Sequence, residues 1–260
     1  QLDDVQEGQK QALIKVGKWQ ALDGEIISLA DALGRVTAES IGAKLSSPHY
    51  HCSAMDGYAV RAEHTLNATE THPITLQLND KAYPVNTGGP LPEYTNAVIM
   101  IEHVNPISAG EIQIYASVAP LQHVRLMGED MVATETVLQV NHKIRPVDLG
   151  ALAGSGNVEI SVRRKPRVTI IPTGSELVTA DQMPKAGQLI EYNSLMLAGQ
   201  ITEAGGITTT HEIVPDDYEE LKAVVKNAIA EKPDLLLVLS GSSAGSRDYT
   251  AHIIDELGDL

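Results

Sequence analysis

Residues 234–245 read Asp234-Leu235-Leu236-Leu237-Val238-Leu239-Ser240-Gly241-Ser242-Ser243-Ala244-Gly245, an unbroken apolar run followed by a loop of glycine and serine. Strands of parallel sheets, which are buried on both faces, have this continuous apolar character. The same order occurs upstream, where Val168-Thr169-Ile170-Ile171-Pro172 leads into Thr173-Gly174-Ser175-Glu176. Both segments predict an α/β domain with a mostly parallel sheet, which binds ligands at the carboxyl ends of its strands.

The segment between these two strands completes the α/β pattern. Helices are predicted over about 194–204 and 218–230, with a strand over 207–214 between them. The side chain of Asp216 or that of Asp217 can cap the second helix.

The rest of the chain has a different texture. Helices are predicted over 5–18 and over 26–40, where Ser28 can act as the cap. Residues 45–121 contain short alternating stretches separated by proline and glycine, which is typical of a β-rich module. The basic residues 163–167 are interpreted as a solvated linker before the α/β domain.

Composition excludes several classes of function. A formal net charge of −15 disfavours binding to nucleic acids and to anionic membranes, because both would be repelled at long range. The single cysteine, Cys52, excludes an intrachain disulfide, and no apolar run is long enough to span a bilayer. We therefore expect a cytoplasmic protein. The chain starts without methionine and stops three residues after Asp255-Glu256-Leu257, so a natural sequence longer than these 260 residues is also an expectation.

Two turns that follow strands, 173–176 and 240–246, are candidate anion sites. A helix that starts at such a turn offers free N–H groups, and glycine allows a phosphate to approach closely. An ordinary turn is the alternative for each, but two on one sheet favour a nucleotide or pterin phosphate site. The residues expected to bind it are Thr173, Gly174, Ser175, Ser240, Gly241, Ser242, Ser243 and Gly245.

The second of these turns also fits another chemistry. Residues 241–245 match G-x-S-x-G, the nucleophile turn of α/β-hydrolases. That fold needs an acid and then a distant histidine downstream, whereas only His252 follows here, nine residues after Ser243. We therefore disfavour a serine hydrolase.

Five carboxylates fall at loop or cap positions. Capping or solvation explains each one alone, but as a set they could hold Mg²⁺, which prefers carboxylates, waters and substrate phosphates. The histidines of His49-Tyr50-His51-Cys52 have no second cluster to complete a four-ligand site, and we interpret them as surface or active-site lining. The five carboxylates are Asp56, Glu176, Asp216, Asp217 and Asp248.

One non-periodic run, Ser53-Ala54-Met55-Asp56-Gly57-Tyr58-Ala59-Val60-Arg61, places a carboxylate beside a glycine and an aromatic. It resembles a signature of the molybdopterin molybdenumtransferases, the MoeA/gephyrin-E family, which insert molybdate into molybdopterin. Further segments resemble the same family in the same order, so that the resemblance covers nearly the whole chain. They are 86–102 (T-G-x-P-L-P…A-V-V-M-x-E), 124–130 (V-R-x-x-G-E-D), 172–178 (S-T-G-D-E-L-V), 187–194 (G-x-I-x-x-S-N-S) and 240–249 (S-G-G-V-S-V-G-x-x-D-Y).

The resemblance implies a multidomain protein with α/β and β parts. Residues 23–45 and 135–163 would form an elongated region, and 46–134 an inserted β-rich domain. Residues 1–22 and 164–260 would form the α/β molybdopterin-binding domain, with a C-terminus that is incomplete relative to the family. Family members are homodimers, and the active site would be shared between the α/β domain of one subunit and the inserted domain of the other.

The implied reaction is the insertion of molybdate into adenylylated molybdopterin, with release of AMP. Mg²⁺ would be held by Glu176, Asp216 and Asp248, with the choice between Asp216 and Asp217 left open. A molybdopterin adenylyltransferase would supply the substrate. The site residues implied are Asp56, Thr87, Asp130, Glu176, Asp216 and Asp248.

The chain departs from the family pattern at two places in the expected site. Ser175 stands where the family has aspartate, and the loop 241–245 is one residue shorter and lacks the second glycine of its pair. These changes keep open an alternative function, a non-catalytic sensor, carrier or scaffold that binds molybdopterin. The preference between molybdate and tungstate also stays open.

Overall fold

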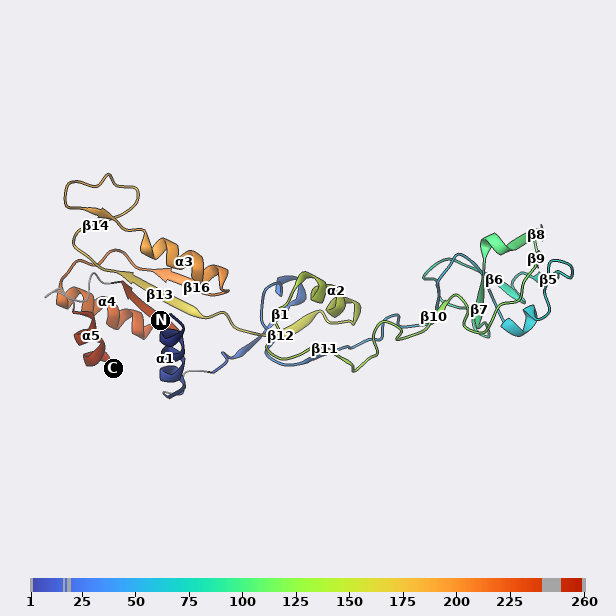
Figure 1. The fold of residues 1–260 in the computed structure, drawn as a ribbon, viewed down its shortest axis with the longest axis horizontal. Helices are drawn as coiled ribbons and strands as arrows, with labels where there is room; N and C mark the ends of the chain where they lie inside the picture. The colour runs from blue at the N-terminus through green and yellow to red at the C-terminus, as the bar shows by residue number, and fades with distance from the viewer. Residues whose placement is uncertain (1, 16, 18–19, 240–248, 259–260) are drawn as a thin grey trace. The chain divides into compact units, whose positions relative to one another are not determined.

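The computed structural model describes residues 2–15, 17, 20–239 and 249–258, and the chain divides into two compact units (Figure 1). The α/β unit comprises Gln1–Glu25 and Arg163–Leu260, and the β-rich unit comprises Ile26–Val162. The finer domain boundaries expected at residues 46 and 134 stay predictions. Among the described residues, no helix combines the length and apolar character needed to cross a membrane.

The α/β unit is built on a three-stranded parallel sheet in the order β16-β13-β17, with bounds Ile207–Thr210, Arg167–Pro172 and Leu235–Leu239. Figure 1 shows α3 (Asn193–Glu203) on one side of this sheet, with α4 (Tyr218–Ala230) and α5 (Thr250–Leu257) on the other. Helix α1 (Leu2–Lys15) belongs to the same unit. The parallel sheet predicted from its apolar strands is confirmed.

The core of this unit lies between the sheet and its helices. Ile171 of β13 packs in one cluster with Leu221 and Val225 of α4 and with Ile253 of α5, all of them buried. Because Ile171 and its neighbour Ile170 point to opposite faces of β13 and both are fully buried, the strand is covered on both sides.

Strand β17 is less buried than its continuous apolar sequence predicts. Among the described residues it pairs only with β13, and Leu235 at its start is 49% exposed. Strand β13 is instead the central one, and five of its six residues are buried. An apolar run alone cannot distinguish these positions, because burial depends on which neighbours pair with the strand.

The basic segment 163–167 is not a solvated linker. The Arg164 guanidinium binds the Asp234 carboxylate in a bidentate pair, with both N···O distances 2.6 Å. The Arg167 backbone N–H donates to the same carboxylate at 2.8 Å. These bonds join the starts of β13 and β17, and they hold the pKa of Asp234 near 2, mainly through the hydrogen bond from Arg164.

The substitution Asp234→Ala is expected to lower the free energy of unfolding by about 2 kcal/mol, since hydrogen bonds to charged groups have that magnitude. In the native protein this contribution is complete above the usual carboxyl pKa of 3.8 and disappears as the pH falls toward about 2. Urea titrations at pH 7 and at pH 3 measure both effects. The control Lys165→Ala, in the same basic segment, should change stability by less than about 0.5 kcal/mol, and equal effects of the two substitutions would contradict the assignment.

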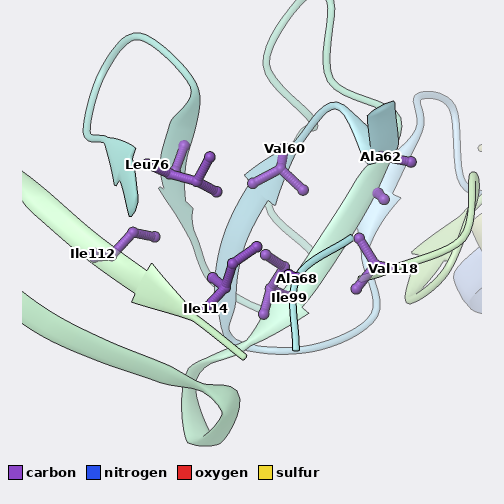
Figure 2. Close-up of a cluster of buried hydrophobic side chains, with 10 residues drawn as sticks. Val60, Ala62, Ala68, Leu76, Ile99, Ile112, Ile114 and Val118 are labelled. Atoms are coloured by element: carbon purple, nitrogen blue, oxygen red, sulfur yellow. The ribbon is translucent and has the colours of Figure 1, made fainter. Parts of the chain in front are cut away.

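The β-rich unit contains two antiparallel three-stranded sheets. One has the order β6-β4-β7, with bounds Ala82–Val85, Gly57–Val60 and Ala97–Met100. The other has the order β5-β9-β8, with bounds Ile74–Gln77, Glu111–Ile114 and Val104–Ser108. Figure 2 shows the aliphatic core of these strands, which includes Val60, Leu76, Ile99, Ile112 and Ile114. The β-rich module predicted from alternation and turn residues is therefore confirmed.

Three two-stranded pairs and one helix complete this part of the chain. The pairs are β1 (Gly24–Ser28) with β12 (Glu159–Arg163), β2 (Ile41–Gly42) with β11 (Thr136–Leu138), and β3 (Cys52–Ser53) with β10 (Val124–Arg125). Helix α2 spans Pro146–Gly154 and packs in a second core through Leu152, together with Ile144 and Val162.

The helix predicted over 26–40 was wrong. Strand β1 occupies its beginning, and the only helical turn is the 3₁₀ segment Leu29–Asp31. Ser28 does act as the cap, accepting a hydrogen bond from the Ala30 N–H. The β-branched pair Ile26-Ile27 favours an extended backbone. The pairing of β1 with β12 then incorporates this extended segment into a two-stranded sheet.

Candidate functional site

The turn 173–176 lies at the carboxyl end of the central strand, as predicted. Both the backbone N–H and the hydroxyl of Thr173 donate to the Leu239 carbonyl at 2.9 Å, at the end of β17. The Gly174 N–H donates to the Val214 carbonyl at 2.9 Å. Hydrogen bonds thus join the turn to the end of β17 and to the segment that follows β16.

The turn does not lead into a helix, which corrects the expected strand-to-helix connection; anion binding at the turn stays a prediction. It continues into β14 (Leu177–Val178), which pairs in parallel with β15 (Leu189–Ile190) before α3 begins at Asn193. One backbone N–H in the first turn of α3 is engaged, because the Glu191 carboxylate accepts from the N–H of Ser194 at 2.9 Å and also from its hydroxyl. A strand followed by glycine and serine does not by itself specify a helix.

The backbone conformation and a close approach within the turn both favour glycine at position 174. Its φ is 147°, and a Cβ there would lie 3.0 Å from both the Glu176 Oε1 and the Leu177 Cγ. Glycine therefore lets the turn fold back so that Glu176 lies beside the backbone.

The two neighbouring aspartates have different roles in the fold. Asp217 caps α4 by accepting from the Glu220 N–H at 2.9 Å. Asp216 instead faces the turn after β13, since its N–H donates to the Ser175 hydroxyl at 2.9 Å and its Oδ2 lies 3.4 Å from the Ser175 N. The structure therefore places Asp216, and not Asp217, beside the candidate site.

Two of the expected magnesium ligands, Glu176 and Asp216, lie among the described residues. Asp248 and the predicted loop residues Ser240, Gly241, Ser242, Ser243 and Gly245 lie outside the described residues. In the part of the chain that the structure describes, no three histidine, cysteine or acidic side chains are grouped to hold a metal. Glu176 belongs to the turn, and Asp216 lies on the segment that is hydrogen-bonded to Ser175 of that turn. Carboxylates, together with water and substrate phosphates, are the ligands that Mg²⁺ prefers.

A pocket of about 470 Å³ opens beside this turn. Thr173 and Glu176 line it, which agrees with two of the predicted site residues. Sequence reasoning missed the lining contributed by the segment before α3, although 187–194 was among the quoted motifs. The remaining lining residues are Pro172, Leu177, Pro184, Gln188, Leu189, Ile190, Glu191, Tyr192, Asn193 and Leu239.

In the β-rich unit the structure brings Asp56 and Thr87 together. The Asp56 Oδ1 accepts from the Thr87 backbone N–H at 2.7 Å and from the Thr87 hydroxyl at 3.0 Å. The backbone bond, and then the hydroxyl bond, lower the pKa of Asp56, whose side chain is exposed. Asp56 is therefore a fixed, exposed carboxylate that carries its charge at neutral pH.

Asp130 has a different partner, which sequence reasoning did not single out. The Arg125 guanidinium binds the Asp130 carboxylate at 2.6 Å and lies 3.4 Å from Glu129. The pKa of Arg125 is raised, mainly by the hydrogen bond to Asp130. The quoted motif 124–130 contains all three residues, so that its two ends form one charged cluster.

Two families of known proteins match successive parts of the chain. Residues 3–156 match the family described as the MoeA N-terminal region (domain I and II). Residues 169–260 match the family described as a probable molybdopterin binding domain.

Individual relatives are similar over most of this chain. A putative molybdopterin biosynthesis protein of Methanocaldococcus jannaschii is 36% identical over 249 residues, 90% of this chain and 62% of that protein. Molybdopterin molybdenumtransferase 2 of Mycobacterium tuberculosis is 33% identical, covering 85% of this chain and 58% of that protein. A crystal structure of a molybdopterin biosynthesis MoeA protein from Pyrococcus horikoshii superposes with a TM-score of 0.82 at 30% identity, over 96% of this chain and 66% of that one. The chain thus spans 57–62% of the length of these and other curated relatives.

Proposed function

Because the chain belongs to the MoeA family of molybdopterin biosynthesis, we propose that it is a molybdopterin molybdenumtransferase. The reaction is the Mg²⁺-dependent insertion of molybdate into adenylylated molybdopterin, with cleavage of the phosphoanhydride and release of AMP. The observation that carries the proposal is the pocket of about 470 Å³ at the carboxyl edge of the parallel sheet, lined by Thr173 and Glu176. It lies in the residues that match the molybdopterin-binding family.

We assign a role in this reaction to each residue at the turn. Glu176 and Asp216 would hold Mg²⁺ at the turn, and the bond from Asp216 N–H to the Ser175 hydroxyl fixes the position of Asp216. Mg²⁺, when bound, neutralises charge on the phosphoanhydride as it breaks. The polar and apolar lining of the pocket orients the organic part of the substrate.

The β-rich unit would contribute a second set of groups. We assign Asp56, Thr87 and Asp130 to the same reaction, in a homodimer whose active site is shared between subunits. Two hydrogen bonds from Thr87 favour the ionised form of the Asp56 carboxylate and fix its direction. Such a carboxylate can orient a cation bound to the reacting oxyanion, or it can accept a proton. The substrate would come from a molybdopterin adenylyltransferase.

Binding without catalysis is the second candidate. The observation that favours it is Ser175, which stands where the family has an acid and is bonded to Asp216, so that the turn carries one carboxylate fewer. A sensor, carrier or scaffold needs the pocket but not the ion.

Calorimetric titration with adenylylated molybdopterin, combined with an AMP assay, separates these candidates. We expect binding, followed by AMP release only when both Mg²⁺ and molybdate are present. Tight binding with no AMP released would establish the non-catalytic function instead. The absence of binding would overturn both.

A further inference from the structure

The pocket of the α/β unit has an exposed tyrosine in its lining. We propose that the Tyr192 ring stacks on the flat, amino-substituted bicyclic ring of the ligand and so determines specificity for that ring. The inference rests on the proposed function and deepens it, because it assigns the residue that recognises the heterocycle rather than its phosphates. Tyr192 stands where the related motif G-x-I-x-x-S-N-S has serine.

The position of Tyr192 is fixed by its neighbours in the chain. The Glu191 N–H donates to the Val178 carbonyl of β14 at 2.9 Å, just before the tyrosine. The Tyr192 carbonyl accepts from the Met196 N–H at 3.1 Å, in the first turn of α3. The backbone is therefore held on both sides, and a rigid element presents the ring at low cost in conformational entropy.

The Tyr192 side chain is not part of the buried core of its unit. The residue is 66% exposed although it lines the pocket. In the described part of the chain, the stacked or edge-on ring pairs are His49 with Tyr50 and Tyr218 with Tyr249, so that Tyr192 belongs to neither. An exposed aromatic beside an apolar pocket is suited to ligand contact, because stacking buries its face without a cost in packing.

The rest of the lining suits a flat polar ring. Pro184, Leu189 and Ile190 give apolar walls, while Asn193 offers an amide group. Gln188 offers its Nε2 donor, since its Oε1 accepts from the Lys185 N–H at 3.0 Å. Amides can both donate to ring carbonyls and accept from amino groups. A pocket of about 470 Å³ is within the usual range for small organic ligands. This chemistry is shared by pterins and purines, and the experiment below separates them.

Calorimetry with three probes tests the proposal on the purified protein: neopterin, AMP, and ribose 5-phosphate, which has no heterocycle. The substitution Tyr192→Ala is expected to lower the affinity for neopterin about tenfold, which is the typical contribution of stacking on an aromatic side chain. Tyr192→Phe keeps the ring and should bind within about twofold of the native protein. The affinity for ribose 5-phosphate should be the same in the Tyr192 variants and the native protein. The matched control Tyr94→Ala, which removes an exposed tyrosine from the other unit, should leave the affinity for all three probes unchanged.

The outcomes are distinct. Native affinity for neopterin in Tyr192→Ala, an equal loss in Tyr192→Phe, or an equal loss for ribose 5-phosphate would each overturn the stacking role. Failure of the native protein to bind either heterocycle would overturn it as well. If AMP but not neopterin binds and depends on the ring, the stacking role stands with a purine, and the proposed pterin function fails. Unchanged thermal midpoints would show that the variants remain folded.

Discussion

Replacing Asp56 with alanine is expected to reduce molybdate-dependent AMP release by at least about 100-fold, the usual scale for a lost acid–base or charge-bearing group. Asp56 is exposed and belongs to none of the buried clusters, and Thr87 donates both of the hydrogen bonds described for its carboxylate. The fold of the β-rich unit should therefore survive the substitution. Single-turnover measurement of AMP, with the circular dichroism spectrum as a check of folding, tests both parts.

Two further variants sharpen this test. Asp56→Asn keeps the shape and can still accept from Thr87, so that an equal loss would assign the effect to the charge. The matched control is Asp80→Ala, an exposed turn aspartate of the same unit, which should retain native turnover. Unchanged turnover in Asp56→Ala would remove Asp56 from the reaction.

Local signals explain what the sequence could predict of the fold. The apolar strand β13 and the amphipathic helix α4 follow from periodicity and capping residues that lie within a few positions of each other. The helix wrongly predicted over 26–40 overlaps strand β1, whose partner β12 lies more than 130 residues away in the sequence, and no local pattern indicates that pairing. The ion pair of Arg164 with Asp234 was missed for the same reason.

The candidate site likewise contains some residues that local sequence signals could predict and others that depend on distant pairing. Thr173 and Glu176 could be predicted because the end of a parallel strand has a known relation to ligand binding. Tyr192 enters the pocket only through the parallel pairing of β14 with β15, which brings the segment before α3 back to the turn. Asp216 could be separated from Asp217 only once the cap of α4 was visible.

The substitution Gly57→Ala is expected to lower the free energy of unfolding by about 3 kcal/mol, at the upper end for overpacking. Gly57 begins β4, the central strand of its sheet, opposite Val85 and Met100. A Cβ at this position would lie 1.9 Å from the Ile99 carbonyl oxygen, which is backbone and cannot rotate away. Urea denaturation measures the loss, and the strands themselves would have to separate to accommodate the methyl group.

The matched control is Gly110→Ala, because a Cβ at this turn glycine of the same unit meets nothing within 4 Å. It should change stability by less than about 0.5 kcal/mol, and an equal effect of both substitutions would contradict the packing argument. Gly57 also adjoins Asp56, whose carbonyl accepts from the Ile101 N–H at 3.0 Å. The clash would displace this bond together with the carboxylate, so Gly57→Ala should also reduce AMP release below that of Gly110→Ala. The signature run around Asp56 therefore needs its glycine for the strand contact that positions the acid.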